Sequence, residues 1–199
     1  MKEFNVVLAG VGGQGTLLAA EILGSAAVED GLNVRVSEIH GMAQRGGAVT
    51  SNVRIGEKVL SPTVMEGRAD VLLGFEPLET LRNLKYASEK TTVIVSDEEI
   101  PPTELAAKGA AYPSMKDLTA KIRSFAKKVF VVEAERLASE AGNALTSNIV
   151  LVGALAAIEN MPVKAESLMK SVRELVPARH VDVNVKAFKL GYDYMKKHA

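Results

Sequence analysis

A glycine-rich motif near the N-terminus constrains this chain more than any other feature. The short apolar run 6–8 leads directly into Gly10, Gly12 and Gly15, which satisfy the pattern G-x-G-x-x-G. Residues 16–28 follow with the composition of a helix. A strand, a glycine loop and a helix in this order are typical of the first unit of a nucleotide-binding α/β fold. The sequence therefore predicts such a unit at the N-terminus.

The motif gives each glycine an expected role. We expect Gly10 to allow a tight turn, Gly12 to let a ligand approach the backbone, and Gly15 to let the helix pack closely on the strand. The free N–H groups at the helix start favour an anion, most often a phosphate. A tight strand-to-helix turn without a ligand is the alternative. The candidate binding residues of this loop are Gly10, Gly12, Gly13, Gln14, Gly15 and Thr16.

A second loop, residues 39–47, carries the other candidate residues and follows a predicted strand at 33–38. Glu38 lies about 20 residues past the glycines, where an acid binds the ribose hydroxyls of a dinucleotide. A solvated carboxylate is the alternative for that residue. Arg45 precedes Gly46 and Gly47 and suits a phosphate or carboxylate, because a guanidinium makes bidentate contacts while glycines let the backbone come close. An arginine on an ordinary surface turn is the alternative here.

Apolar runs alternate with helical patterns along the rest of the chain. Strands are expected at 48–55, 69–75, 91–96 and 128–132, with a short return strand at 59–60. Helices are expected from Pro77, at 115–127, 134–141, 148–159 and 165–175, and from 182 to the C-terminus. This order predicts a single α/β domain over residues 1–199. Its Rossmann-like, doubly wound sheet is mostly parallel, with helices on both faces and a helical C-terminal third.

The composition excludes several classes of partner and site. Among 199 residues, 24 Lys+Arg balance 24 Asp+Glu, so no net charge attracts nucleic acid or an anionic membrane. The absence of cysteine removes thiolate zinc sites and cysteine-ligated iron–sulfur clusters, and the three histidines are far apart, so we expect no metal site. No general acid–base pair or activated nucleophile is recognisable, and no catalytic residue is predicted.

The sequence shows neither a signal peptide nor an apolar stretch of the roughly 20 residues that span a bilayer. We therefore expect a cytoplasmic protein that does not act on a membrane.

Several segments together carry a resemblance to a known family. Segment 9–19, with G-V-G-G-Q-G, and segment 37–49, with E-I-H-G-M-A-Q-R-G-G, resemble the small subunit of indolepyruvate:ferredoxin oxidoreductases. The first element is shared with all gamma-type subunits of 2-oxoacid:ferredoxin oxidoreductases, and the second is more specific to the indolepyruvate branch. The likeness spans nearly the whole chain and includes segments 53–56, 61–62, 69–79 with Arg82, and 112–113.

The resemblance implies a Rossmann-like domain within a larger enzyme. That enzyme oxidatively decarboxylates an aryl pyruvate with coenzyme A and yields an acyl-CoA, CO2 and reduced ferredoxin. It implies that thiamine diphosphate and the iron–sulfur clusters sit on a large catalytic subunit, so that this chain alone is inactive. Residues 12–15 and 45–47 then become candidates for contacting coenzyme A or the large subunit. A stand-alone NAD- or FAD-binding oxidoreductase and a structural scaffold without a ligand are the alternatives.

Overall fold

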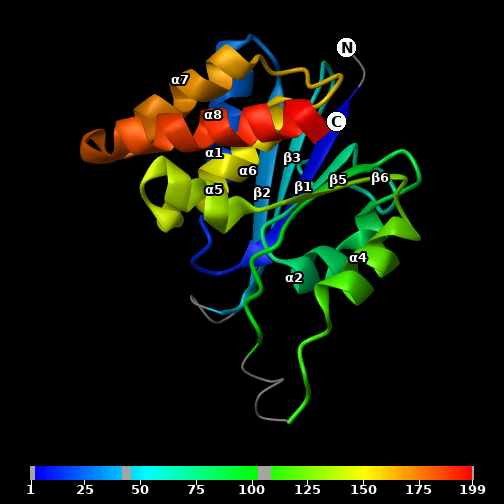
Figure 1. Ribbon diagram of the computed structural model, residues 1–199. Helices are drawn as coiled ribbons and strands as arrows, with labels where there is room; N and C mark the ends of the chain where they lie inside the picture. Colours follow the sequence, from blue (N-terminus) through cyan, green and yellow to red (C-terminus); the bar gives the residue numbers. More distant parts are fainter. Residues whose placement is uncertain (1–2, 42–45, 103–108, 199) are drawn as a thin grey trace.

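The fold is a six-stranded sheet with helices on both faces, seen in a computed structural model that describes residues 3–41, 46–102 and 109–198 (Figure 1). The strand order is β2-β3-β1-β4-β5-β6. The strands are β1 (Phe4–Val11), β2 (Val34–His40), β3 (Ala48–Ile55), β4 (Val71–Gly74), β5 (Thr92–Ser96) and β6 (Lys128–Val132).

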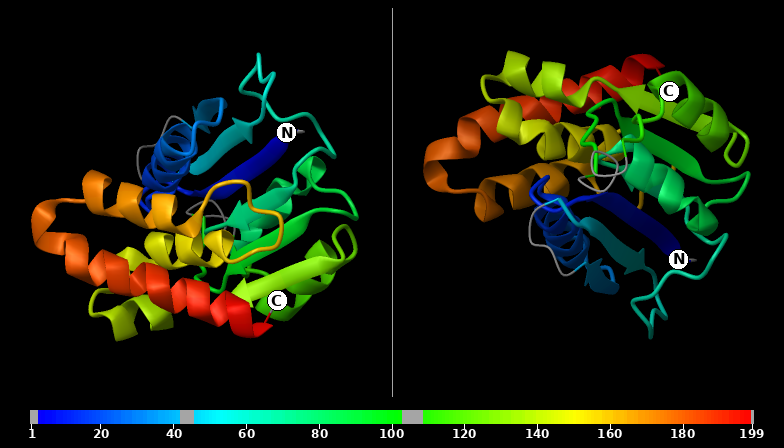
Figure 2. Two further views of the ribbon diagram at one scale, coloured as in Figure 1. Left: turned by 90° about the horizontal axis from the view of Figure 1, so that it is seen from above. Right: turned by 90° about the horizontal axis from the view of Figure 1, so that it is seen from below.

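Helices cover the two faces unequally. Helices α2 and α4 lie on one face, and α1 and α5 to α8 lie on the other, where they build the thicker layer (Figure 2). The predicted helices, including the helical C-terminal third, are confirmed with shifts of a few residues at their ends. The helices are α1 (Thr16–Glu29), α2 (Pro77–Arg82), α4 (Met115–Arg123), α5 (Ala134–Ala141), α6 (Ser147–Ala156), α7 (Ala165–Leu175) and α8 (Val181–His198).

One strand of the sheet runs against the others. β1, β4, β5 and β6 are parallel, whereas β3 is antiparallel to both of its neighbours, β1 and β2. The predicted mostly parallel sheet is therefore confirmed, but β3 separates β2 from β1. In a simple doubly wound order those two strands would be adjacent. β2 becomes an edge strand as a result, and it continues to His40, two residues into the predicted loop.

The predicted return strand at residues 59–60 is wrong. That segment has no strand pairing, although Val59 is buried and Leu60 is exposed. The Arg54 side chain near the end of β3 donates from Nη1 to the carbonyl oxygens of Ser61 at 2.8 Å and Thr63 at 3.2 Å. These hydrogen bonds hold the segment that follows, residues 61–63, beside β3 through a side chain and without strand pairing.

The sheet separates two hydrophobic clusters. Leu8 and Leu73 pack with buried residues of α1 and α6, whereas Val7 and Leu72 pack in a second cluster that includes residues of α4. Successive strand residues point to opposite faces, so strands covered on both sides need continuous apolar runs. This explains why β1 and β4 are apolar at consecutive positions.

Helices α6 and α8 cross with their backbones in contact. A Cβ on Gly153 of α6 would lie 2.0 Å from the carbonyl oxygen of Phe188, and one on Gly191 of α8 would lie 1.9 Å from that of Val150. Real Cβ atoms do not come this close to a carbonyl. The two glycines therefore allow the helices to approach this closely. Glycine is needed here for packing and not for a turn.

We expect Gly153→Ala to lower the free energy of unfolding by about 1–3 kcal/mol, because an added methyl overpacks this crossing. Helix propensity alone acts in the opposite direction and favours alanine by about 1 kcal/mol. Gly24→Ala in α1 is the matched control, since its new methyl meets only Val36 Cγ2 at 3.2 Å. Urea unfolding of both variants measures the difference, and equal stabilities would contradict the observed crossing.

Candidate functional site

A cavity of about 690 Å³ lies at the N-terminal end of α1, between the glycine loop and the ends of β2 and β3. The loop forms one wall, and the adjoining ends of the two strands form the other. Its lining residues are Val11, Gly12, Gly13, Gly15, Thr16, Leu17, Leu18, His40, Gly41 and Val49. The glycine loop, which the sequence predicted as part of the site, therefore lines this cavity. The ends of β2 and β3, which flank the second predicted loop, line it too.

The start of α1 suits an anion. Gly15 is the N-cap residue, so no side chain caps the helix, and no acidic residue lies in the first turn. The N–H groups of a first helical turn have no partner within the helix and carry a partial positive charge. Thr16 is 3 % exposed, and its Oγ1 has no hydrogen-bond partner among the described residues. Unpaired donors beside a cavity are what an anionic group would satisfy.

Gly10 does not form the predicted turn. It lies inside β1 and pairs with Val49 of β3. A Cβ at this position would lie 2.8 Å from the Cβ of Phe75 and 2.9 Å from Oγ1 of Thr16. The turn role is therefore wrong: Gly10 allows the end of β1 to pack against the residue that follows β4 and against the first residue of α1.

Gly15 has a packing role, but its neighbour differs from the predicted one. Its φ of 74° is left-handed, which favours glycine. A Cβ would lie 2.4 Å from Nδ2 of Asn148. The close contact is thus between the start of α1 and α6, rather than between α1 and the strand that precedes it.

The two glycine segments are bonded to each other through their backbones. The N–H of Gly12 donates to the carbonyl of Gly47 at 2.8 Å, and the N–H of Gly46 donates to the carbonyl of Gly12 at 3.2 Å. This reciprocal pair holds the second loop beside the first. Arg45, the predicted anion ligand of the second loop, lies outside the described residues.

Gln14 serves the structure of the loop. Its Oε1 accepts from the N–H of Val11 at 2.9 Å, and its Nε2 donates to the carbonyl of Phe75 at 2.9 Å. The side chain thus ties the loop to the end of β4, and it is absent from the lining of the cavity. The sequence alone gave no signal for these contacts.

Glu38 is not brought to the cavity. It is an exposed residue of β2 that pairs with Ser51 of β3, and the cavity is lined instead by His40, two residues further along the same strand. Neighbouring strands are about 4.8 Å apart, so the inserted β3 moves β2 one strand further from the glycine loop than a dinucleotide fold would place it. The geometry therefore gives no support to the ribose role.

One buried acid, Glu76, lies just past the carboxyl end of β4. Glu76 is 1 % exposed and caps α2 by accepting from the N–H of Glu79 at 2.7 Å. Glu76 also accepts a hydrogen bond from the Tyr112 hydroxyl. Burial raises the pKa of the Tyr112 hydroxyl, and the bond to Glu76 raises it further. The hydroxyl therefore stays a donor.

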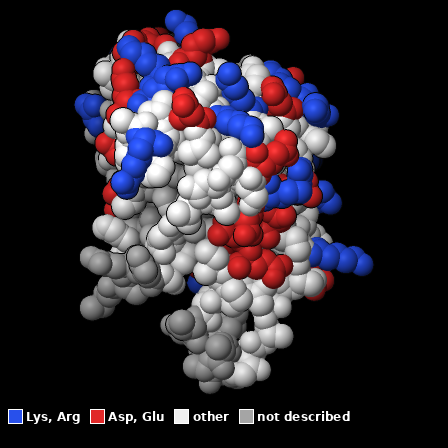
Figure 3. Space-filling model, turned by 60° about the vertical axis from the view of Figure 1, so that its left-hand side comes forward, with Lys and Arg blue, Asp and Glu red and all other residues white. Residues whose placement is uncertain are grey.

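Acidic side chains gather on one face of the molecule (Figure 3). A cavity of about 590 Å³ between the end of β5 and α5 is lined by Asp97, Glu98, Glu99, Glu135, Arg136 and Ser139. Four carboxylates and one guanidinium disfavour a phosphate at this position by like-charge repulsion. The charge distribution thus distinguishes this cavity from the one at the start of α1.

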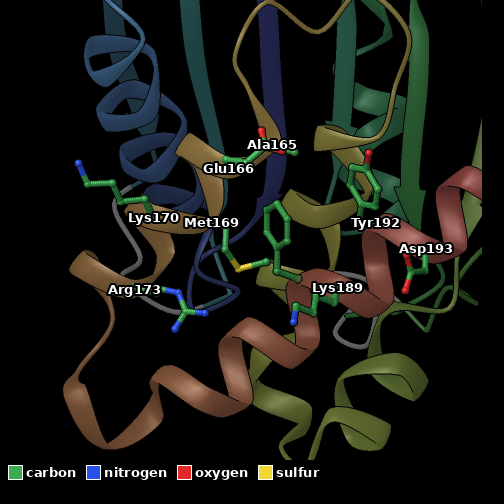
Figure 4. A pocket seen from close by; sticks show the side chains of 9 residues that line it. Ala165, Glu166, Met169, Lys170, Arg173, Lys189, Tyr192 and Asp193 are labelled. Atoms are coloured by element: carbon green, nitrogen blue, oxygen red, sulfur yellow. The ribbon is translucent and has the colours of Figure 1, made fainter.

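A third hollow, of about 430 Å³, lies between α7 and α8, where Met169 and Phe188 form part of an apolar lining. Arg173 and Lys189 lie near Met169 in this groove (Figure 4) and form no ion pair with any described residue. None of the predicted site residues lines it.

The described residues offer neither a metal-binding cluster nor a membrane-spanning helix. No group of three or more His, Asp or Glu side chains in the described part of the chain could hold a metal ion. Within the same residues, no helix is both long enough and apolar enough to cross a membrane.

Glu98→Gln is expected to raise the stability of the isolated chain at pH 7, with a gain that shrinks as the pH falls toward 4. Burial raises the pKa of the Glu98 carboxyl, opposed by hydrogen bonds from Gln14 and Ser147. Because the folded state then holds the proton more tightly than the unfolded state, the wild type loses stability as the pH rises through this range. Urea unfolding between pH 4 and 8 measures the effect, with the exposed Glu99→Gln as control. A gain independent of pH would show that the charge is not its cause.

Comparison with known proteins identifies the family. The family model described as pyruvate ferredoxin/flavodoxin oxidoreductase matches residues 5–194. The chain is 45% identical over 198 residues to indolepyruvate oxidoreductase subunit IorB of Pyrococcus horikoshii, covering 99% of this chain and 98% of that one. It is 28% identical over 186 residues to the common gamma subunit of the pyruvate/ketoisovalerate oxidoreductases of Pyrococcus abyssi, covering 92% of each.

The same fold is found in the crystal structure of pyruvate oxidoreductase subunit PORC from Thermotoga maritima. The TM-score is 0.72 at 22% identity, and the match covers 97% of both chains. The likeness in fold and the likeness in sequence both extend over nearly the whole chain. This chain belongs to the pyruvate ferredoxin/flavodoxin oxidoreductase family.

Proposed function

We propose that this chain is the subunit without redox centres of an indolepyruvate-type 2-oxoacid:ferredoxin oxidoreductase. The enzyme would oxidatively decarboxylate an aryl pyruvate with coenzyme A to an acyl-CoA and CO2, and would reduce ferredoxin. The observation that carries the proposal is the 45% identity to an indolepyruvate oxidoreductase subunit over 99% of this chain. A likeness that leaves almost no residue of either chain unmatched supports a shared role in the same kind of complex.

The proposal divides the chemistry between two subunits. Thiamine diphosphate and the iron–sulfur clusters would be bound by a large catalytic subunit, and ferredoxin would meet this chain only through the complex. The sequence contains no cysteine to ligate a cluster, which fits that division. The location would be the cytoplasm, where coenzyme A and ferredoxin are available.

Within that enzyme, the cavity at the start of α1 would hold a phosphate of coenzyme A. The uncapped first turn supplies N–H donors, and the buried Thr16 hydroxyl is a further donor without a partner. The backbones of Gly12, Gly13 and Gly15 would let the phosphate approach, with the Gly46–Gly47 segment beside them. Such donors bind and orient an anion but take no part in bond making, and no catalytic residue is assigned to this chain.

The strand order argues against a stand-alone dinucleotide enzyme. β3 lies between β1 and β2, and the acid expected at the ribose, Glu38, is absent from the cavity lining. A scaffold that binds no small molecule remains an outcome of the tests below.

The function is tested by purifying this chain alone and together with the large subunit from the same organism. We expect the isolated chain to be colourless and inactive. The complex should reduce ferredoxin only when both an aryl pyruvate and coenzyme A are present. An iron–sulfur absorption band or 2-oxoacid oxidation in the isolated chain would contradict the proposal, and so would the absence of a complex.

Thr16→Val should raise the KM for coenzyme A of the complex roughly 10- to 100-fold. Losing a hydrogen bond to a charged group costs about 1.5–3 kcal/mol. Because the hydroxyl is buried without a partner, its removal should not lower the melting temperature of the isolated chain. These two effects together separate a ligand role from a structural one.

Thr119→Val in α4 is the matched control. Its hydroxyl is also buried but donates to the carbonyl of Met115 at 2.7 Å. This variant should lower the melting temperature and leave the KM for coenzyme A unchanged. If Thr16→Val leaves that KM unchanged in an intact complex, the cavity does not bind the phosphate, and the scaffold role is favoured.

A further inference from the structure

The outer side of β2 is an open sheet edge. β2 is seven residues long and ends the strand order, with β3 as its neighbour. Its register with β3 runs unbroken from Val34 opposite Ile55 to His40 opposite Val49. Natural proteins usually protect such an edge with a bulge, a proline or a covering segment. β2 contains neither a proline nor a bulge, so its edge is suited to accepting another strand.

The hydrogen bonds at the two ends of β2 show which backbone groups face outward. The carbonyl of Asn33 accepts from the N–H of Gly56 at 3.0 Å, and the N–H of Gly41 donates to the carbonyl of Ala48 at 3.1 Å. In an antiparallel pair, residues bond to the neighbouring strand alternately. The odd-numbered residues from 33 to 41 therefore bond to β3, and the even-numbered residues of β2 direct their backbone N–H and C=O groups away from the sheet.

A side chain confirms this alternation. The Arg35 guanidinium donates from Nη1 to the carbonyl oxygen of Val34 at 2.9 Å, which is one of the outward carbonyls. Among the described residues, no backbone group bonds to the outward groups of Val36, Glu38 and His40. Three consecutive outward residues are enough to pair with an added strand.

Exposed apolar side chains lie on β2 and on α1, the helix that packs against it. Four of the eight exposed large hydrophobic residues of the described chain lie on α1 and β2. They are Leu17, Val28, Val36 and Ile39. Val36 faces α1, where its Cγ2 lies near Gly24. Side chains alternate between the two faces along a strand, so Ile39, three residues later, points to the opposite face of the sheet. An added strand would therefore find apolar surface on both of its faces.

The charge pattern of β2 does not suit a second copy of the same strand. If two β2 strands paired antiparallel over their full length, residue 36 of one would face residue 38 of the other. The two Glu38 carboxylates would then be diagonal neighbours, about 7–8 Å apart at their backbones. Arg35 would face Ile39 and would have no acid opposite. A different chain is the better occupant.

We propose that an extended segment of the large subunit pairs with the outer edge of β2 and adds a seventh strand to the sheet. This inference rests on the proposed function, which supplies the partner. His40, at the end of this edge, lines the cavity at the start of α1. A strand added along β2 therefore brings the large subunit to the mouth of the cavity that holds coenzyme A, where the acyl acceptor is needed.

The test compares Val36→Pro with Val36→Ala. Both variants remove the valine side chain, but proline also removes the outward N–H and places its ring on the outer side of the edge. Proline is tolerated at edge positions whose N–H does not bond within the sheet. We expect Val36→Ala to bind the large subunit within about threefold of the wild type and Val36→Pro to bind at least about tenfold more weakly. The two variants should melt within a few degrees of each other.

Residue-resolved hydrogen exchange provides a second readout that does not depend on a variant. The amides of Val36, Glu38 and His40 should exchange rapidly in the isolated chain and slowly in the complex. Those of Ser37 and Ile39, which bond to β3, should exchange slowly in both.

The outcomes are distinct. If the wild type forms no complex, the proposed function fails. If the complex forms but Val36→Pro binds like Val36→Ala and the three amides stay rapid, the edge inference fails and the function stands. If the isolated chain is a dimer that Val36→Pro makes monomeric, the edge belongs to a second copy, and the inference is overturned.

Discussion

The fixed position at which α1 begins is the constraint on which the rest of the site depends. Gly15 adopts a left-handed conformation only five residues after Gly10, and its missing side chain lets Asn148 of α6 close over the start of the helix. A serine or aspartate N-cap would satisfy the first N–H groups of α1, but here a glycine leaves them free. The same feature that packs α1 onto α6 therefore leaves an electropositive helix end facing a cavity. Gln14 and the bonds between Gly12 and the Gly46–Gly47 segment keep that cavity in shape.

The antiparallel strand β3 changes what this glycine motif can do. It separates β2 from β1, so the acid that a dinucleotide fold would offer to a ribose is not at the cavity. It also leaves β2 as an open edge that ends beside the cavity. A helix start that would bind one phosphate, next to the strand edge proposed to accept another chain, would suit a subunit that presents a ligand to its partner. The acidic cavity beside α5 would repel such a ligand, which leaves the start of α1 as the electrostatically suitable position.

The sequence predicted the parts of this structure that depend on local pattern. Apolar runs located the strands, and Pro77 marked the start of α2. The direction of β3 could not be predicted, because the residues of a strand such as 48–55 fit either orientation. Asn52 of β3 is fully buried although its side chain is polar, which the sequence did not indicate. The roles of Gly10 and Gln14 depend on Phe75, which is more than 60 residues away in the chain and packs beside them only in the folded sheet. Neither a motif nor a periodicity reports such a contact.

Within the assembled enzyme, α1 would present its uncapped end to coenzyme A. A cryo-electron microscopy map of the complex with coenzyme A bound tests this arrangement most directly. We expect a phosphate within about 3 Å of the first amide nitrogens of α1 and of the Thr16 hydroxyl oxygen, with the large subunit close to His40. Coenzyme A bound with its phosphates elsewhere, while side chains of the large subunit fill the cavity at the start of α1, would contradict it.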